Sequence, residues 1–212
     1  VKYVRSLYRR RVRYRERRFV IEGVRLVEEA FRAGIAPALL FYSQGVNAIP
    51  GGREVLVELQ KGGSPTFAVS EKVMRAMADT VSPQGVLAVV PFVELAPPPS
   101  PSLGLVLDRL RDPGNLGTIL RSANAAGVEQ VILAPRTVDP YNPKVVRGAM
   151  GAHFRLPFEV LSWPEITETL GAVQVLLADV RAEQAYYEVD WTRPSALIIG
   201  GEAYGASREA RE

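Results

Sequence analysis

The sequence has 212 residues, of which 47% are hydrophobic, so it can bury one large core or two modest ones and is not typical of a disordered chain. No apolar run approaches the ~20 residues that cross a bilayer and no segment resembles a signal peptide, so we expect a soluble cytoplasmic protein with no membrane partner. The absence of cysteine excludes disulfides, thiolate catalysis and cysteine-ligated metal, and the single histidine, His153, is too few for a histidine-based zinc site, so we expect no metal.

The net charge of +3 is unevenly distributed along the chain. Residues 1–18 contain nine Lys or Arg and one acid, Glu16, which leaves 17 basic and 22 acidic residues in the remainder. Tyrosines are interleaved with these cations, and such a segment suits RNA, because arginines contact phosphates and rings stack on bases. The alternative is a solvated basic helix with Val4 and Leu7 facing the core. The candidate RNA-contacting residues at this end are Arg9, Arg10, Arg11, Arg13, Arg17 and Arg18.

The first half of the chain alternates short strands and helices. Apolar runs predict strands over 19–22, 38–42, 66–69 and 86–90. Helical periodicity predicts helices over 24–33 and 53–61, and Ser70 is expected to cap a third helix that extends to Met77. The alternation over about 90 residues indicates a small α/β sandwich.

A proline-rich segment follows, with four prolines between residues 97 and 101. Such a segment is a semi-rigid spacer, so we divide the chain into a domain over 1–92, a linker over 93–102 and a second domain over 103–212. Strands are predicted over 103–107, 130–134, 173–178 and 196–200, with helices over 116–126 and 144–150. Buried-looking strands that alternate with helices indicate an α/β fold with a mostly parallel sheet. The dinucleotide fingerprint and the Walker phosphate loop are both absent.

The first segment with candidate chemistry runs from residue 108 to 127. The turn 112–114 precedes Asn115, which is placed to cap the next helix. Arg121 lies on the polar face of that helix, where it can bind a phosphate through two parallel hydrogen bonds. The alternative is a surface arginine beside a structural cap, which this segment alone favours.

Two further segments carry unusual residues. A strand delivers the glycine-rich loop 200–205 with one carboxylate, Glu202, and its glycines allow a ligand to approach the backbone closely. The alternative is an ordinary strand-to-helix turn. The segment 142–157 is basic and rich in glycine, and it contains Lys144, Arg147 and His153. A lone histidine more often has a packing role than a catalytic one.

Taken together and in chain order (108–127, then 142–157, then 200–205), the three segments resemble the SpoU-type (SPOUT class, TrmH-like) RNA ribose 2′-O-methyltransferases. The segments 19–23 and 84–88 also look like the family's substrate-binding domain, which is similar to a small ribosomal protein. The resemblance implies a carboxyl-terminal domain of the trefoil-knot type, a homodimer formed through that domain, and S-adenosylmethionine as cofactor. It also implies catalytic roles for Asn115, Arg121 and Glu202. The cofactor-contacting residues predicted on this basis are Gly200, Gly201, Gly205 and Ala178, and Lys144 and Arg147 join the predicted RNA-contacting set.

The implied reaction is methyl transfer from S-adenosylmethionine to a ribose 2′-hydroxyl of structured RNA, with large-subunit ribosomal RNA ahead of transfer RNA. The family ends in a third motif that completes the knot, and this sequence stops at Glu212 before one, so we expect further chain beyond that residue. Three alternatives remain at this point: a transfer RNA 2′-O-methyltransferase, a non-catalytic RNA-binding protein of the same fold, and a generic nucleotide-binding enzyme.

Overall fold

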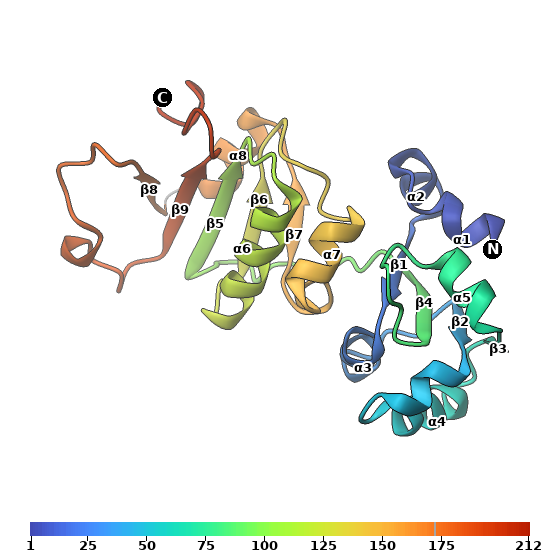
Figure 1. The fold of residues 1–212 in the computed structure, drawn as a ribbon. Helices are drawn as coiled ribbons and strands as arrows, with labels where there is room; N and C mark the ends of the chain where they lie inside the picture. The colour runs from blue at the N-terminus through green and yellow to red at the C-terminus, as the bar shows by residue number, and fades with distance from the viewer. Residues whose placement is uncertain (172) are drawn as a thin grey trace. The chain divides into compact units, whose positions relative to one another are not determined.

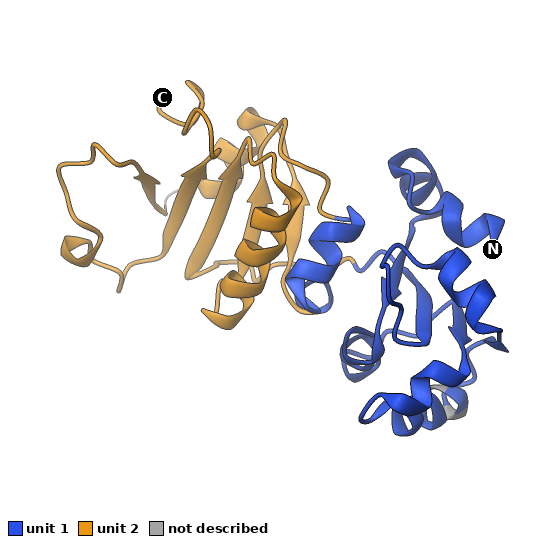
Figure 2. Cartoon of the chain, viewed as in Figure 1, with its two compact units in different colours: residues 1–93, 141–154 blue, residues 94–140, 155–212 orange. Residues whose placement is uncertain are grey.

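The computed structural model describes residues 1–171 and 173–212, with the side chains of Leu59 and Lys61 left aside. The chain forms two compact units, coloured separately in Figure 2. Unit 1 contains Val1–Val93 and Tyr141–Phe154, and unit 2 contains Glu94–Pro140 and Arg155–Glu212. The chain therefore leaves unit 1 just before the proline-rich segment. It returns for residues 141–154, which the sequence analysis had grouped with 103–212.

Unit 1 is built on a four-stranded sheet in the order β1-β4-β2-β3 (Figure 1). The strands are β1 (Arg18–Glu22), β2 (Leu39–Tyr42), β3 (Thr66–Ala68) and β4 (Val86–Pro91). Strand β4 runs antiparallel to both neighbours, whereas β2 and β3 are parallel. Five consecutive residues of β4, Val86 to Val90, are buried, as expected for a central strand covered on both faces.

Helices cover both faces of this sheet. They are α1 (Lys2–Ser6), α2 (Arg10–Glu16), α3 (Val24–Arg32), α4 (Gly52–Lys61), α5 (Glu71–Met77) and α7 (Pro143–Ala149), with 3₁₀ turns η1 (Gln44–Ala48) and η2 (Ala152–Phe154). Val4 of α1 and Met74 of α5 share a core with Leu87 of β4. Phe19 of β1 instead packs its ring against Tyr141 and Phe154, so α7 and its flanking residues belong to this core. The predicted cap at Ser70 is confirmed, because its side chain accepts a hydrogen bond from the backbone N–H of Val73.

Unit 2 is a five-stranded, fully parallel sheet in the order β7-β6-β5-β9-β8. Its strands are β5 (Leu103–Asp108), β6 (Gln130–Leu133), β7 (Phe158–Val160), β8 (Gln174–Ala178) and β9 (Ser195–Gly200). Helix α6 (Pro113–Ala125) lies in front of the sheet and α8 (Trp163–Leu170) behind it in Figure 1, and η3 (Tyr186–Glu188) lies between β8 and β9 in the sequence. The α/β class and the parallel sheet predicted from the sequence are confirmed.

The register brings strand ends together at one edge of unit 2. Asp108 at the end of β5 is level with Gly200 at the end of β9, and Ala178 at the end of β8 is level with Ile199. The carboxyl edge of a parallel sheet is where ligands bind in open α/β folds, so this register positions the candidate site. Within the part of the chain that the structure describes, no helix is both long enough and apolar enough to cross a membrane.

One local prediction is wrong. Asn115 was expected to cap a helix starting at Leu116, but α6 begins at Pro113 and its cap is Asp112, whose side chain accepts a hydrogen bond from the N–H of Asn115 at 2.9 Å. Proline suits the first position of a helix, because the N–H that it lacks has no partner there. Asn115 therefore lies inside the first turn, with its side-chain amide free for another contact.

Candidate active site

The central contact of the site in unit 2 joins the two motif segments that lie far apart in the sequence. The Asn115 side chain donates to the Glu202 carboxylate at 3.0 Å. The backbone N–H groups of Arg111 and Asp112 donate to the same carboxylate at 3.1 and 3.2 Å. Glu202 thus holds the β5–α6 loop from the loop that follows β9, and the two predicted catalytic residues Asn115 and Glu202 are brought together.

These donors change the acidity of Glu202. Partial burial alone would raise its pKa, but hydrogen bonds from its own N–H, from the Asn115 side chain and from the backbone of Arg111 and Asp112 outweigh burial and lower the pKa to about 2. A carboxylate with so low a pKa is a weak proton acceptor near neutral pH. The geometry therefore fits a residue that positions the loop rather than one that removes a proton.

A second acid, which the sequence analysis did not single out, ends the neighbouring strand. Asp108 is fully buried, and its Oδ2 accepts a hydrogen bond from the backbone N–H of Ser207 at 2.5 Å. Its Oδ1 has no hydrogen-bond partner among the described atoms. The available signal was an acid directly after the apolar run 105–107, since a buried carboxylate at a strand end requires a specific partner.

The glycines of the loop after β9 have different reasons to be there. A Cβ on Gly200 would lie 2.2 Å from the N of Ala206, and one on Gly201 would lie 2.6 Å from the carbonyl oxygen of Arg109. These two glycines are therefore required by the packing of the loop itself. Gly205 has a φ of +66°, and a Cβ there would lie 3.8 Å from Nη2 of Arg211. Gly201 and Gly205 exchange backbone hydrogen bonds of 3.1 and 2.9 Å. The turn leaves exposed backbone at Gly205, beside the carboxyl ends of the strands, which fits a nucleoside cofactor bound at that edge.

A hollow beside this loop is strongly basic. Its lining includes Arg109, Arg111 and Arg136 around residues 201–205. The Arg111 guanidinium lies 5.8 Å from the ring centre of Tyr204, and that ring is 80% exposed. Three guanidinium groups and one exposed ring suit a phosphate with an adjacent base. The sequence analysis missed all four residues, because single arginines and tyrosines in loops carry no pattern.

Arg121 and Ala178 complete the predicted set in unit 2. Arg121 is exposed on α6, about 9 Å of helix rise beyond Asn115, and no acid in the described parts of the chain pairs with it. Ala178 is exposed at the end of β8. Both residues are therefore accessible to a ligand, although neither contacts the Asn115–Glu202 pair through a hydrogen bond among the described residues.

Comparison with known proteins identifies the family of the chain. The model of the SpoU rRNA Methylase family matches residues 102–212, and an MRM3-like substrate binding domain matches residues 1–88. The chain belongs to the SpoU rRNA methylase family.

Relatives of this SpoU chain extend over almost all of it. It is 36% identical to an uncharacterised tRNA/rRNA methyltransferase of Synechocystis, over the whole chain and 78% of that protein. It is 33% identical to the 23S rRNA (guanosine(2553)-2′-O)-methyltransferase RlmP of Bacillus subtilis, over 97% of the chain and 80% of that protein. The crystal structure of an AdoMet-bound rRNA methyltransferase from Sinorhizobium meliloti superposes with a TM-score of 0.85 at 31% identity, over 100% of this chain and 81% of that one.

The basic end of this SpoU chain lies on α1 and α2 of unit 1. Arg9, Arg10 and Arg11 are exposed there, and Arg10 lies 5.2 Å from the ring centre of Tyr14. Arg17 lies over the ring of Phe92 at 5.3 Å, and Arg18 donates to the hydroxyl of Tyr3 at 3.3 Å.

Arg13 differs from the other predicted RNA-contacting residues of α2. Only 3% of its surface is exposed, and its guanidinium donates to the carbonyl oxygen of Leu7 at 2.9 Å. Arg13 thus ties α2 to α1 from the inside and is unavailable to a phosphate in this structure.

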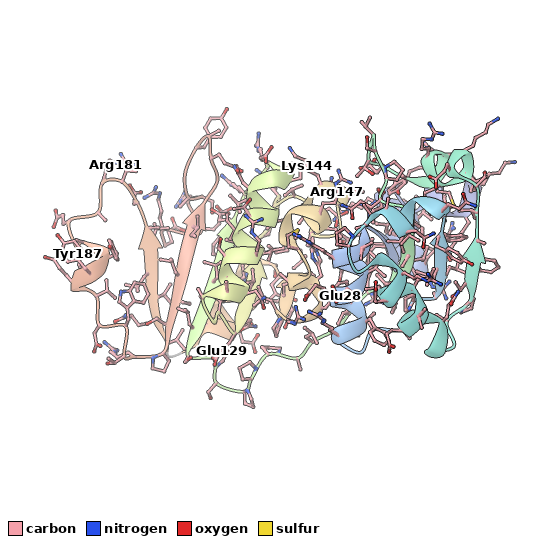
Figure 3. The ribbon with its side chains drawn as sticks, turned by 60° about the horizontal axis from the view of Figure 1, so that its bottom comes forward. Glu28, Glu129, Lys144, Arg147, Arg181 and Tyr187 are labelled. Atoms are coloured by element: carbon pink, nitrogen blue, oxygen red, sulfur yellow. The ribbon has the colours of Figure 1, made fainter. Side chains whose placement is uncertain are left out.

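The remaining predicted residues lie on and beside α7, within unit 1. Lys144 is exposed, and Arg147 donates a hydrogen bond to Asp79 at 2.7 Å. Lys144 and Arg147 are labelled in Figure 3. His153 is buried, with its ring 5.9 Å from that of Phe19 and 5.7 Å from that of Tyr141, so it has a packing role. No cluster of acidic and histidine side chains suitable for a metal occurs among the described residues.

Proposed function

We propose that this protein transfers a methyl group from S-adenosylmethionine to a ribose 2′-hydroxyl of ribosomal RNA. The observation that carries the proposal is the hydrogen-bonded joining of Asn115 to Glu202 at the carboxyl edge of the parallel sheet. It brings together the two motifs in which the family's functional residues lie. The names of the relatives support the reaction and the cofactor, since one acts on the 2′-O of a 23S rRNA guanosine and another is AdoMet-bound.

The cofactor is held, in this proposal, by the loop after β9 and the end of β8. Gly200, Gly201, Gly205 and Ala178 are the contacting residues, through backbone groups rather than charged side chains, and Gly205 and Ala178 are the exposed members of the set. When bound, S-adenosylmethionine supplies an electrophilic methyl group on its sulfonium. The protein then has to position the ribose hydroxyl in line with that group, and positioning of this kind supplies much of an enzyme's rate.

The polar residues of the chain have separate roles in fixing a loop, binding phosphates and positioning the group that removes the hydroxyl proton. Glu202 and Asn115 fix the β5–α6 loop, and the basic hollow with Arg109, Arg111 and Arg136 holds RNA phosphates. Arg121 is essential and binds a phosphate next to the target ribose. A guanidinium has only N–H donors and no acceptor for the hydroxyl proton, so the bound phosphate oxygen relays that proton to solvent instead.

The finer points of the proposal concern the substrate and the assembly. We place large-subunit ribosomal RNA ahead of transfer RNA, and propose a cytoplasmic homodimer formed through the carboxyl-terminal domain. The decisive experiment maps 2′-O-methylation on total RNA from cells with and without the protein. A ribose in large-subunit RNA that is unmethylated only in cells without the protein supports the proposal. A loss confined to transfer RNA makes transfer RNA the substrate instead. An unchanged methylation map contradicts the proposal.

The arginines of α2 supply a separate test of RNA binding. Changing Arg9, Arg10 and Arg11 together to Gln preserves the helix and removes three exposed charges. The slope of log affinity against log salt should fall by about 0.7–0.9 for each lost phosphate contact. Arg13→Gln is unsuitable for this comparison, because Arg13 is buried and its loss affects folding. An unchanged slope in the triple variant would remove α2 from the RNA-binding surface.

A further inference from the structure

A second hollow, in unit 1, includes only one of the candidate site residues described above, Arg147, in its lining. Its walls are the start of α3, the loop 79–84 before β4, residues 49–50 and the end of α7. The cavity volume of about 650 Å³ falls in the range of sites that hold small molecules.

One wall of this hollow is fixed by a carboxylate with no free acceptor position. Glu22 accepts hydrogen bonds from the Tyr8 hydroxyl at 2.8 Å, from the N–H of Asp79 at 2.7 Å, and from the N–H and hydroxyl of Thr80 at 3.4 and 2.8 Å. Burial and the neighbouring Glu22 raise the pKa of Tyr8, so its hydroxyl remains a donor. Four donors occupy the four lone-pair directions of the carboxylate, so Glu22 holds the wall and has no acceptor position left for a ligand.

A second part of the wall depends on the close approach of Gln84 to Gly23 and Val24. The Gln84 side-chain oxygen accepts a hydrogen bond from the N–H of Val24 at 3.2 Å, at the start of α3. Gly23 has a φ of +96°, and a Cβ there would lie 2.7 Å from that oxygen. The segments 19–23 and 84–88, which carry the resemblance of unit 1 to a substrate-binding domain, therefore meet at this hollow.

Besides Pro50 and Ser82, the remaining lining of the hollow provides apolar side chains and cations. Leu26, Ile49 and Met150 are apolar, and Met150 is 46% exposed on left-handed backbone with a φ of +49°. Arg25 is exposed and has no acid partner among the described residues, and Arg147 has further N–H donors beyond the one that it gives to Asp79. Apolar side chains and two cations in the same lining match a flat base attached to a phosphate.

We propose that this hollow binds one unstacked nucleotide of RNA, with the base against Met150 and Ile49 and a phosphate on Arg25 and Arg147. Proteins read single-stranded RNA by splaying out bases and holding them against side chains, whereas a stacked duplex offers no free base. The inference rests on the proposed function only in taking RNA as the partner. The lining of this hollow shares no residue with the site proposed for methyl transfer.

Two variants test the two halves of the hollow. Arg25→Ala removes the unpaired cation and keeps a good helix former on α3. Met150→Gly removes the apolar side chain and tolerates the left-handed backbone. Arg53→Ala is the matched control, because Arg53 is an exposed arginine of α4 in the same unit and does not line the hollow. Affinities are measured on the full chain for a mixed-sequence single-stranded RNA hexamer and for a blunt 12-base-pair RNA duplex.

Both variants should lower the affinity for the hexamer by about five- to tenfold and the affinity for the duplex by less than about twofold. The control variant should change neither affinity. Arg25→Ala should also lower the hexamer's salt slope by about 0.7, and Met150→Gly should leave that slope unchanged. Hexamer affinity that survives both changes overturns the proposal. Equal losses for hexamer and duplex also overturn it, because they would indicate a backbone contact without a held base.

Methyl transfer to large-subunit ribosomal RNA is measured in parallel on the unaltered protein. Absent transfer with the hexamer pattern intact would refute the proposed function and leave the nucleotide site standing. Normal methyl transfer, together with variants that bind the hexamer as tightly as the unaltered protein does, would refute the nucleotide site and leave the proposed function standing.

Discussion

Glu22 in unit 1 and Glu202 in unit 2 both anchor a distant loop by accepting its hydrogen bonds, but in different surroundings. Each glutamate lies at or just after the end of a strand and accepts backbone hydrogen bonds from a loop that is distant in the sequence, 57 residues away for Asp79 and 91 for Arg111. Glu22 adds the hydroxyls of Tyr8 and Thr80, which are uncharged and partly buried. Glu202 adds an asparagine amide and lies beside three arginines.

The difference indicates what each glutamate can do. Both glutamates line hollows that also contain arginines, but Glu202 holds the β5–α6 loop of the candidate active site, whereas Glu22 holds a wall of unit 1. We therefore expect changes around Glu202 to act mainly on turnover, and changes around Glu22 to act mainly on the stability of unit 1. The predictions below separate these two outcomes.

The largest effect is expected from Arg121→Ala. Turnover should fall by at least about 10²-fold, because the phosphate next to the reacting ribose loses its bidentate partner, while the melting temperature stays unchanged for an exposed residue. Arg121→Lys should also be impaired, since an ammonium cannot reproduce the planar fork. Ser122→Ala, at the next exposed position of α6, is the control. Near-normal turnover in Arg121→Ala would remove this residue from the site.

Glu202→Ala should lower kcat by about 10²-fold. The β5–α6 loop loses three hydrogen bonds, and a displacement of about 1 Å near the reacting groups has an effect of that size. Glu183→Ala changes an exposed acid elsewhere in unit 2 and should leave kcat intact. A large loss of thermal stability with unchanged kcat would show that Glu202 acts as Glu22 does.

Glu22→Ala should reduce the free energy of unfolding by about 2 kcal/mol, because the donors of Tyr8, Asp79 and Thr80 lose their acceptor. Tyr8→Phe removes one donor from the same network and should cost about 1 kcal/mol. Denaturant unfolding followed by circular dichroism measures both values. A kcat that falls while stability is retained would contradict the division between the two glutamates.

The smallest expected effect is the pH dependence caused by titration of the Glu202 carboxylate. With a pKa of about 2 in the folded protein and an ordinary value near 4.3 when unfolded, Glu202 contributes stability above the higher value, and that contribution is lost as the pH falls through about 2. The side-chain amide resonances of Asn115 should therefore remain constant from pH 7 to about pH 4 and shift only at lower pH. A midpoint near 4.3 would mean that the hydrogen bonds to Glu202 are not formed in solution.

The sequence predicted the long elements well and the contacts between them poorly. Fully apolar runs such as 86–90 and 103–107 determine their own strands, and Ser70 caps its helix as expected. Strand β7 and helix α8 were missed, because 158–160 is short and only half-buried and Trp163–Leu170 follows it directly. Short edge strands take their conformation from their neighbours more than from their own residues.

At the candidate site, the sequence identified residues but not their partners. Asn115 and Glu202 were both selected, yet nothing in their spacing of 87 residues predicts a hydrogen bond between them. Asn115 was assigned the cap that Asp112 provides, since both side chains are good caps and only the start of α6 distinguishes them. Arg13 was grouped with the exposed arginines, because a charge run does not reveal which of its members turns inward.

The return of residues 141–154 to unit 1 has a practical consequence for dissecting this protein. The chain passes between the units three times, so neither unit is one continuous stretch of sequence. A fragment covering 103–212 would contain α7 without Phe19, against which Tyr141 and Phe154 pack their rings. It would expose these aromatic side chains to solvent and promote self-association. A truncation at the proline-rich segment therefore produces a fragment that is prone to aggregate. To express unit 2 alone, residues 141–154 have to be replaced by a polar linker.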